Sequence, residues 1–195
     1  IEAVRIKRRT GATACVSTQA GCAAGCTFCA SGADGLIRNL SAGEIVEQVM
    51  ALGDEVNRVV YMGVGEPLMN LEAVLKSMRI LRDRRGLALP TSGMTISTIG
   101  DPAGLRRLRE VHMRFNLTIS LHATRDDVRH RLMPGTSRHC VEDVVAAHLD
   151  LAGGDRLGGR ALCAAHTLGG IRVGGLGLAL HCSGSRRRSR GRLLL

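Results

Sequence analysis

Hydrophobic and polar positions follow two alternating patterns along the first 150 residues. Short apolar runs predict buried strands over 12–19, 58–65, 93–100 and 114–123. Between them, apolar residues recur at three- and four-residue spacing, which predicts helices over 41–54, 70–86, 102–111, 124–133 and 138–151. Ser41 and Glu44 form a capping box at the start of the first helix, and Asn70 is expected to cap the second.

Strands and helices in this order predict an α/β fold with a parallel sheet. About four strand–helix units and a broken fifth are fewer than the eight of a full barrel, so the chain is expected to form a partial barrel or an open doubly wound sheet. Both architectures bind ligands at the carboxyl ends of their strands. The residues directly after each strand are therefore the candidates for chemistry.

A cysteine-rich loop follows the first predicted strand. Cys22, Cys26 and Cys29 have the spacing C-x3-C-x2-C, and three thiolates on one short loop can hold a four-iron cluster that keeps one iron open for a ligand. Zinc is the alternative, but it usually takes four protein ligands in two pairs, and no second pair follows. Seven cysteines and no export signal disfavour disulfides. Phe28 is expected to shield the loop, and Cys15 is expected to lie in the core.

Polar residues also stand at the next three strand ends, and the candidates for ligand binding are Gly65 and Glu66, Ser97 and Thr98, and Ser120 and His122. A carboxylate at a strand exit can accept hydrogen bonds from a ligand ammonium, and hydroxyls can reach a ligand carboxylate or ribose. Each residue also has a plain structural interpretation, such as a tight turn or a core histidine. Polar groups at four consecutive strand ends favour one shared site.

The cysteine spacing, with an aromatic residue before the third Cys, resembles the radical S-adenosylmethionine (SAM) superfamily. Within it, the first three quarters of the chain resemble the enzymes that methylate carbon-2 of adenine in ribosomal RNA. The resemblance is carried by CVSTQAGCAAGCTFCASGADGLIRNLSAGEIVEQV, VVYMGVGEPLMN, MTISTIG and LTISLHATRDDVRHRLMP. It implies a partial (β/α) radical SAM barrel. It also implies a 4Fe-4S cluster on Cys22, Cys26 and Cys29, and SAM bound by Gly65, Glu66, Ser97, Ser120, Leu121 and His122. Arg38 and Asn39 match the family without an assigned role.

The same resemblance implies the chemistry and the partners. An electron passed to SAM would yield a 5′-deoxyadenosyl radical, which activates a methyl group carried on a cysteine before its transfer to the adenine ring. The implied partners are ribosomal RNA, transfer RNA as a second candidate, and a reductant such as flavodoxin or ferredoxin, all in the cytoplasm. No apolar run reaches the roughly 18 residues of a membrane span, so no membrane partner is expected. Aromatic residues are 2% of the chain, which disfavours RNA-binding modules built on aromatic platforms.

The resemblance ends near Asp150. Beyond it we find neither the family's fifth strand, nor the Asn that completes its SAM site, nor its two reactive cysteines. The methyl-carrier cysteine is therefore not assigned, because none of the remaining candidates stands in a matching sequence; these are Cys140, Cys163 and Cys182. The chain also starts without Met. We expect an incomplete copy of the enzyme, with another radical SAM activity, or a non-catalytic fragment or basic RNA-binding remnant, as the alternatives.

The positive charge lies mostly at the end of the chain. The sequence has 27 Lys and Arg against 17 Asp and Glu, and residues 151–195 hold eight Arg and one acidic residue, Asp155. This Gly-, Arg- and Leu-rich segment has no helical or alternating period. It is expected to be a basic tail that binds RNA phosphates, or sequence translated out of frame. We therefore expect a radical SAM core over 1–150 and a disordered or out-of-frame tail over 151–195.

Overall fold

The computed structural model describes residues 1–136, 138–152 and 161–164. Its main sheet has six strands in the order β1-β2-β5-β6-β7-β8. The strands are β1 (Val4–Lys7), β2 (Ala12–Cys15), β5 (Val56–Tyr61), β6 (Met94–Thr98), β7 (Asn116–Ser120) and β8 (Ala161–Ala164). The β1–β2 pair is antiparallel and all other neighbours are parallel. The predicted α/β class with a mainly parallel sheet is confirmed.

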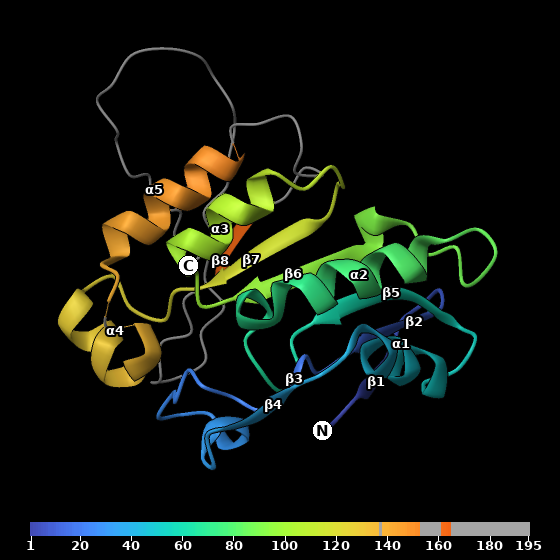
Figure 1. The fold of residues 1–195 in the computed structure, drawn as a ribbon, viewed down its shortest axis with the longest axis horizontal. Helices are drawn as coiled ribbons and strands as arrows, with labels where there is room; N and C mark the ends of the chain where they lie inside the picture. Colours follow the sequence, from blue (N-terminus) through green and yellow to red (C-terminus); the bar gives the residue numbers. More distant parts are fainter. Residues whose placement is uncertain (137, 153–160, 165–195) are drawn as a thin grey trace.

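In Figure 1 the helices lie over one face of this sheet, except for the short helix Asp126–Leu132, which lies beyond the ends of the strands. They are α1 (Ala42–Ala51), α2 (Leu71–Arg82), α3 (Pro102–Arg109), α4 (Asp126–Leu132) and α5 (Val141–Ala152). The capping box of α1 is confirmed, because the Ser41 hydroxyl accepts the Glu44 N–H and the Glu44 carboxylate accepts the Ser41 N–H. The expected cap of α2 is wrong: the Asn70 side chain donates to the carbonyls of Thr18 and Leu40 instead.

The predicted strand over 12–19 is divided in two. Its first half is β2, and its end is β3 (Gln19–Gly21), which pairs antiparallel with β4 (Leu36–Asn39) as a separate hairpin. Neither β1 nor β4 shows alternation of buried and exposed residues, since every residue of both is exposed. A periodicity argument therefore has no signal for these two strands.

Strand β8 corrects the expectation that no fifth strand follows Asp150. It pairs parallel with β7 over four residues, from Leu117 opposite Ala161 to Ser120 opposite Ala164. Its sequence, ALCA, is short and surrounded by glycines, so it gives no pattern that composition alone could separate from its surroundings. The other expectations for residues 153–160 and 165–195 lie outside the described residues.

The buried faces of the strands and helices form one hydrophobic core. Val59, Ile96 and Leu117 occupy neighbouring parallel strands and are completely buried, and Met78 of α2 covers the sheet. This packing fixes the strands side by side, so that the carboxyl ends of β2, β5, β6 and β7 meet at one edge. None of the helices in the described part of the chain is long and apolar enough to span a membrane.

His148 of α5 is a buried ionisable group within this packing. It is 3% exposed, and its Nδ1 atom has no hydrogen-bond partner. Burial lowers the pKa of His148 because it disfavours the charged imidazolium. Protonation of this side chain therefore opposes folding.

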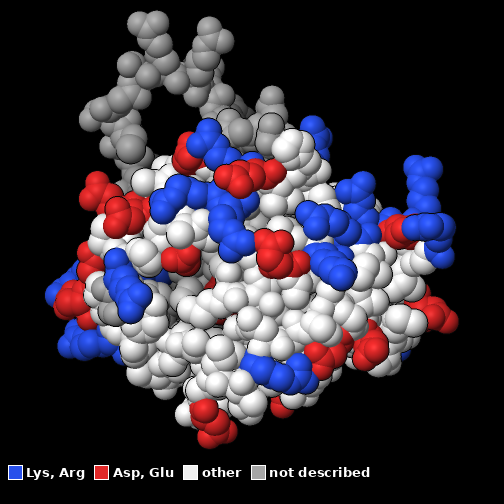
Figure 2. All heavy atoms as spheres, viewed as in Figure 1, with Lys and Arg blue, Asp and Glu red and all other residues white. Residues whose placement is uncertain are grey.

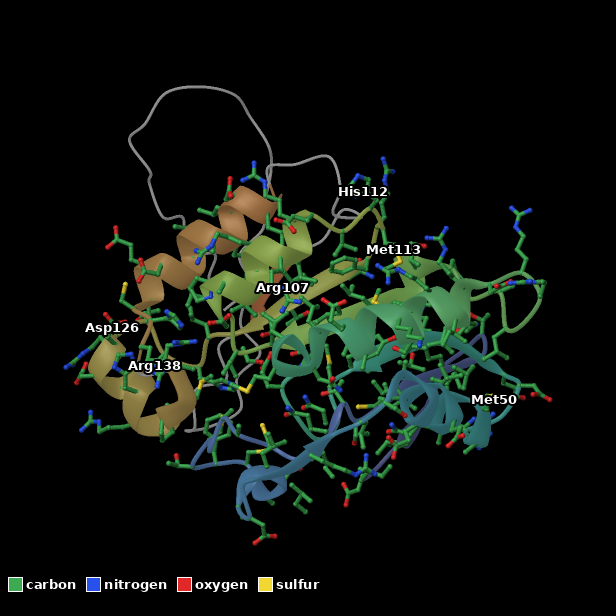
Figure 3. All side chains as sticks on the ribbon, viewed as in Figure 1. Met50, Arg107, His112, Met113, Asp126 and Arg138 are labelled. Atoms are coloured by element: carbon green, nitrogen blue, oxygen red, sulfur yellow. The ribbon has the colours of Figure 1, made fainter. Side chains whose placement is uncertain are left out.

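We predict that the protein loses stability as the pH falls below about 6.5, the ordinary pKa of histidine, because the unfolded chain then binds a proton that the folded chain rejects. His148→Leu should remove most of this effect, about 1 kcal/mol between pH 7 and pH 5. Urea unfolding at both pH values measures it. His112→Leu is the control, since His112 is exposed on the loop after α3 (Figure 3). An equal change in the free energy of unfolding between pH 7 and pH 5 in wild type and His148→Leu would contradict the prediction.

Candidate functional site

The carboxyl ends of the parallel strands open into a cavity of about 220 Å³. Eight of the nine residues expected at the site line this cavity: Cys22, Cys26, Cys29, Gly65, Glu66, Ser97, Ser120 and His122. Leu121 is the exception, because its side chain is 2% exposed and belongs to the hydrophobic core. The structure thus brings together residues that lie a hundred positions apart in the sequence.

The three cysteines lie on the loop between β3 and β4. Cys22 and Cys26 are half-buried, Cys29 is exposed, and all three are free thiols. Burial raises the pKa of Cys26 to about 11, and the neighbouring Cys22 and Cys29 act in the same direction. The loop starts at Gly21, where φ is +72° and a Cβ atom would collide with the Gly35 carbonyl oxygen, so only glycine fits there.

The cysteine loop is docked onto the segment that ends α4. The Thr27 N–H donates to the Leu132 carbonyl at 2.9 Å, and the Gly135 N–H donates to the Ala24 carbonyl at 2.9 Å. Ala24 packs with Ile99 and Met133 in a small apolar cluster that the cysteines Cys22 and Cys26 also contact. The loop is therefore fixed between the exit of β6 and the end of α4, and its thiols face the cavity.

The thiols fit a cluster better than a single metal ion. Within residues 1–136, 138–152 and 161–164, no three His, Cys, Asp or Glu side chains converge closely enough to hold one ion. In a cubane cluster each thiolate binds a different iron, so the sulfurs must face a common space and not a common point. Three cysteines around one cavity meet that requirement, whereas a structural zinc site usually takes four protein ligands around one ion.

Glu66 is buried at the base of the cavity. Its carboxylate accepts hydrogen bonds from the Thr98 hydroxyl at 2.5 Å, the Ile99 N–H at 2.9 Å and the Leu68 N–H at 3.0 Å. Burial raises the pKa of Glu66, and these three hydrogen bonds act in the opposite direction. A carboxylate has about four acceptor positions, so protein donors occupy most of them. The Thr98 hydroxyl is also committed to this bond, although the sequence placed it among the ligand-binding groups.

Gly65 allows the turn after β5 to touch the cysteine hairpin. Its φ is +106°, and a Cβ atom there would lie 2.6 Å from the Cβ atom of Gln19. The Gln19 side chain uses this closeness, because its Oε1 atom accepts the Glu66 N–H at 2.8 Å. Gln19 was not among the residues expected from the sequence. It is completely buried directly before the cysteine loop, and a buried amide is normally held by hydrogen bonds.

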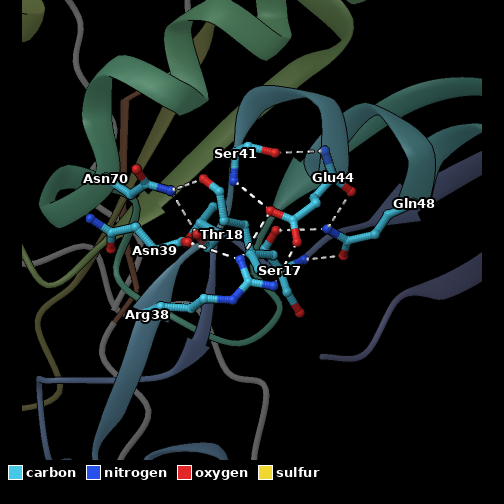
Figure 4. Close-up of polar contacts among 9 residues, drawn as sticks. Ser17, Thr18, Arg38, Asn39, Ser41, Glu44, Gln48 and Asn70 are labelled. Carbon is cyan, nitrogen blue, oxygen red and sulfur yellow. Dashed lines mark hydrogen bonds and ion pairs between the residues drawn. The ribbon is translucent and has the colours of Figure 1, made fainter.

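A polar network continues from Gln19 to α1, and Figure 4 shows the part of it that joins Arg38 and Asn39 to Glu44. The Gln19 Nε2 atom donates to the Asn39 side chain at 2.7 Å, which joins β3 to β4. Both terminal nitrogens of Arg38 donate hydrogen bonds to the Glu44 carboxylate, at 2.6 and 3.0 Å. These bonds join β4 to the start of α1. Arg38 and Asn39, which had no role from the sequence, therefore anchor the hairpin that carries the cysteines.

The ends of β6 and β7 supply the polar wall of the cavity. The Ser97 and Ser120 hydroxyls lie 3.4 Å apart on these adjacent parallel strands. His122 follows with φ of +60°, a left-handed conformation that is uncommon outside glycine and often marks functional sites. Its ring contacts the Phe28 ring with 4.6 Å between centroids, so the loop and the β7 end meet. Phe28 is 39% exposed, so it only partly shields the loop from solvent as the sequence analysis expected.

Two further residues, Tyr61 and Cys15, lie near the site. Tyr61, which the sequence analysis did not single out, lines the cavity from the end of β5, and its hydroxyl bonds to Ser77 of α2 at 3.0 Å. Its hydrophobic, strand-terminal position gave no signal of such a role. Cys15 is half-buried on β2 and is not among the residues that line the cavity.

Comparisons with known proteins agree with this geometry. The family described as the radical SAM superfamily matches residues 16–152. A probable RNA methyltransferase of Rhodopseudomonas palustris is 60% identical over 145 residues, which is 74% of this chain and 40% of that protein. A probable dual-specificity RNA methyltransferase RlmN of Thermus thermophilus is 42% identical over 153 residues, which is 75% of this chain and 43% of that protein.

A solved structure shows the same fold. The radical SAM methyltransferase of Sphaerobacter thermophilus superposes with a TM-score of 0.80 at 37% identity, over 85% of this chain and 50% of that chain. This chain therefore spans half or less of the relatives it matches, which agrees with the predicted partial barrel. Since the family match covers more than half of its residues, the chain belongs to the radical SAM superfamily.

Proposed function

We propose that the chain is the cluster- and SAM-binding part of a radical SAM methyltransferase that acts on an adenine of ribosomal RNA. The observation that carries the proposal is the single cavity onto which the three cysteines, the Glu66 turn and the Ser97–Ser120 wall all open. The relatives named as RNA methyltransferases support the substrate class. Transfer RNA is a second proposed substrate, a flavodoxin or ferredoxin the proposed reductant, and the cytoplasm the proposed compartment, since the thiols must stay reduced.

Each group at the cavity has a proposed task. Cys22, Cys26 and Cys29 hold a 4Fe-4S cluster, which when bound supplies the electron that cleaves SAM. The remaining position on the Glu66 carboxylate and the backbone of Gly65 bind the SAM amino group. The hydroxyls of Ser97 and Ser120 hold its carboxylate or ribose. Leu121 acts through its backbone, and His122 with Phe28 closes the cavity beside the cysteine loop.

The distribution of surface charge is weaker support for an RNA substrate than the similarity to RNA methyltransferases. Figure 2 shows basic and acidic side chains interspersed over the face covered by the helices. Several of the basic ones are paired, as Arg107 is with Glu72 and Arg109 with Asp150. A continuous basic stripe, which would mark a phosphate-binding surface, does not run over this face.

The methyl-carrier cysteine stays unassigned. Cys140 is half-buried directly before α5, its sulfur accepts the Asp143 N–H at 3.4 Å, and it does not line the cavity. The side chain of Cys163 and all of Cys182 lie outside the described residues. We further propose that residues 1–150 form the radical SAM core and that 151–195 form a separate tail, apart from the strand β8.

We predict that anaerobic reconstitution with iron and sulfide gives a brown protein with about four irons per chain. Cys22→Ala, Cys26→Ala and Cys29→Ala should each lose most of the iron, because each removes one thiolate from the cavity. Iron and sulfide assays with visible absorption measure this. Cys15→Ala and Cys140→Ala are matched controls that should keep the cluster. Zinc in place of iron, or full iron in Cys26→Ala, would contradict the proposal.

We predict that Ser120→Ala weakens SAM binding to the reconstituted protein by about tenfold or more, since a hydrogen bond to a charged group contributes about 1.5–3 kcal/mol. Equilibrium binding measures the affinity, and release of 5′-deoxyadenosine after reduction measures cleavage. Ser92→Ala is the control, because Ser92 is exposed at the other end of β6. A reconstituted chain that binds SAM no better than its cysteine variants would favour a non-catalytic fragment.

We predict that Glu66→Gln lowers the free energy of unfolding by about 1–3 kcal/mol, because the amide nitrogen would face donors and leave one of them unpaired. Urea unfolding of the protein without a cluster measures this, so the result does not depend on SAM. Glu72→Gln is the control, since Glu72 is 78% exposed in its ion pair with Arg107 and should change stability by less than about 0.5 kcal/mol. Equal effects of the two substitutions would contradict the role given to Glu66.

A further inference from the structure

Arg129 of α4 is a completely buried cation with unmet hydrogen-bonding capacity. Its side chain is among the largest that are fully buried, and its Nη2 atom donates to the Ile99 carbonyl at 2.6 Å. Its Nε and Nη1 atoms are buried without any hydrogen-bond partner. A guanidinium does not lose its proton in proteins, so the charge cannot be removed by titration. An unpaired buried charge strongly opposes folding, and something must compensate it.

No carboxylate among the described residues forms an ion pair with Arg129. Asp126, at the start of the same helix (Figure 3), accepts the Val141 N–H at 2.7 Å. Asp101 is bonded to His139 at 2.9 Å and to the Gly104 N–H at 2.6 Å. Both acids are therefore hydrogen-bonded to other groups, and neither forms a direct ion pair with the guanidinium.

A dissolved anion does not meet this requirement either. Arg129 borders a second cavity of about 240 Å³, lined also by Asp101 and His139. The two unpaired nitrogens have almost no surface that solvent can reach, so an ion in that cavity would not touch them. A buried water molecule could accept their hydrogen bonds but would not neutralise the charge.

The cysteine loop packs against the end of the helix that carries Arg129, where Cys26 contacts the apolar cluster of Ala24, Ile99 and Met133. The helical turn that starts at Arg129 ends at Met133, whose N–H donates to the Arg129 carbonyl at 2.8 Å. This turn contains Leu132, which accepts the Thr27 N–H, and Gly135 shortly after it donates to Ala24. Burial lowers the pKa of Arg129, whereas Asp126 and Cys26 act in the opposite direction because their negative charges lie within electrostatic reach of the guanidinium. The Cys26 thiolate is therefore one of the two negative groups that stabilise the Arg129 cation electrostatically.

We infer that Arg129 is a positioning residue for the cluster: its guanidinium compensates the negative charge of the thiolate-bound cluster. The inference rests on the proposed cluster site. A cluster with three thiolates is a net anion, and reduction adds one more negative charge. A buried cation beside it stabilises the reduced form more than the oxidised form, and thus raises the reduction potential. Its bond to Ile99, whose N–H donates to Glu66, also links this cation to the Glu66 turn.

The test compares three substitutions on α4 in the reconstituted full chain. Arg129→Met removes the charge but keeps the length, Arg129→Lys keeps the charge, and Arg131→Met removes an exposed charge from the same helix. A redox titration followed by electron paramagnetic resonance measures the potential. We expect Arg129→Met to lower the ratio of reduced to oxidised cluster at least tenfold at a fixed potential, a shift of about 59 mV. Arg129→Lys and Arg131→Met should stay within a third of that shift.

A second measurement separates this role from a merely structural one. Without a cluster, Arg129→Met should unfold at the same or a higher urea concentration than the wild type, because an uncompensated buried charge is gone. A chain that fails to fold, or unfolds at lower urea, shows a structural role and overturns the inference. Unchanged potentials at full iron content, or a potential in Arg129→Lys equal to that of Arg129→Met, also overturn it. A wild type that binds no iron overturns the cluster site itself.

Discussion

The arrangement of the site depends on one buried carboxylate. Glu66 belongs to the turn after β5, its carboxylate binds the backbone at the exit of β6, and its N–H binds Gln19 at the base of the cysteine hairpin. Three segments that are remote in sequence are thus joined through a single residue. Because water hardly reaches these bonds, their geometry is retained only if all of the partners are present together. The position of the cysteines relative to the serine wall follows from this junction.

The general location of the site could be predicted from the sequence, because it follows from topology. In a parallel α/β sheet the carboxyl ends of adjacent strands meet at one edge, whatever side chains they carry. Cys22, Gly65, Ser97 and Ser120 each lie at or shortly after the end of a strand that the hydrophobic pattern identifies. Their presence around one cavity therefore required only the order of the elements.

The contacts that hold the site could not be predicted, because they depend on partners far away in the chain. Asn70 has the sequence of a helix cap, yet its amide binds two carbonyls of the hairpin segment. Arg129 stands in a highly charged stretch, TRDDVRHRLM, which is typical of a solvated helix, but it is completely buried and binds the Ile99 carbonyl after β6. The periodicity of apolar residues predicts which face of a helix or strand is buried. It does not predict which other segment of the chain packs on a polar position. For the same reason the pattern missed β8, a short strand that the edge of β7 pairs with.

Burial disfavours the charged form of three groups in and next to the cysteine site. It opposes the thiolate of Cys26, it opposes the ionised form of Glu66, and it opposes the cation of Arg129. Packing that served stability alone would place apolar side chains at such positions. In the proposed holoprotein, a cluster held by Cys22, Cys26 and Cys29 would relieve two of the three, since its irons would neutralise the thiolates and its net negative charge would compensate the cation of Arg129. The third is satisfied by protein donors that also fix the turn. On this proposal the electrostatic cost of the region would be shared between a bound cluster and backbone donors at the edge where the strands end.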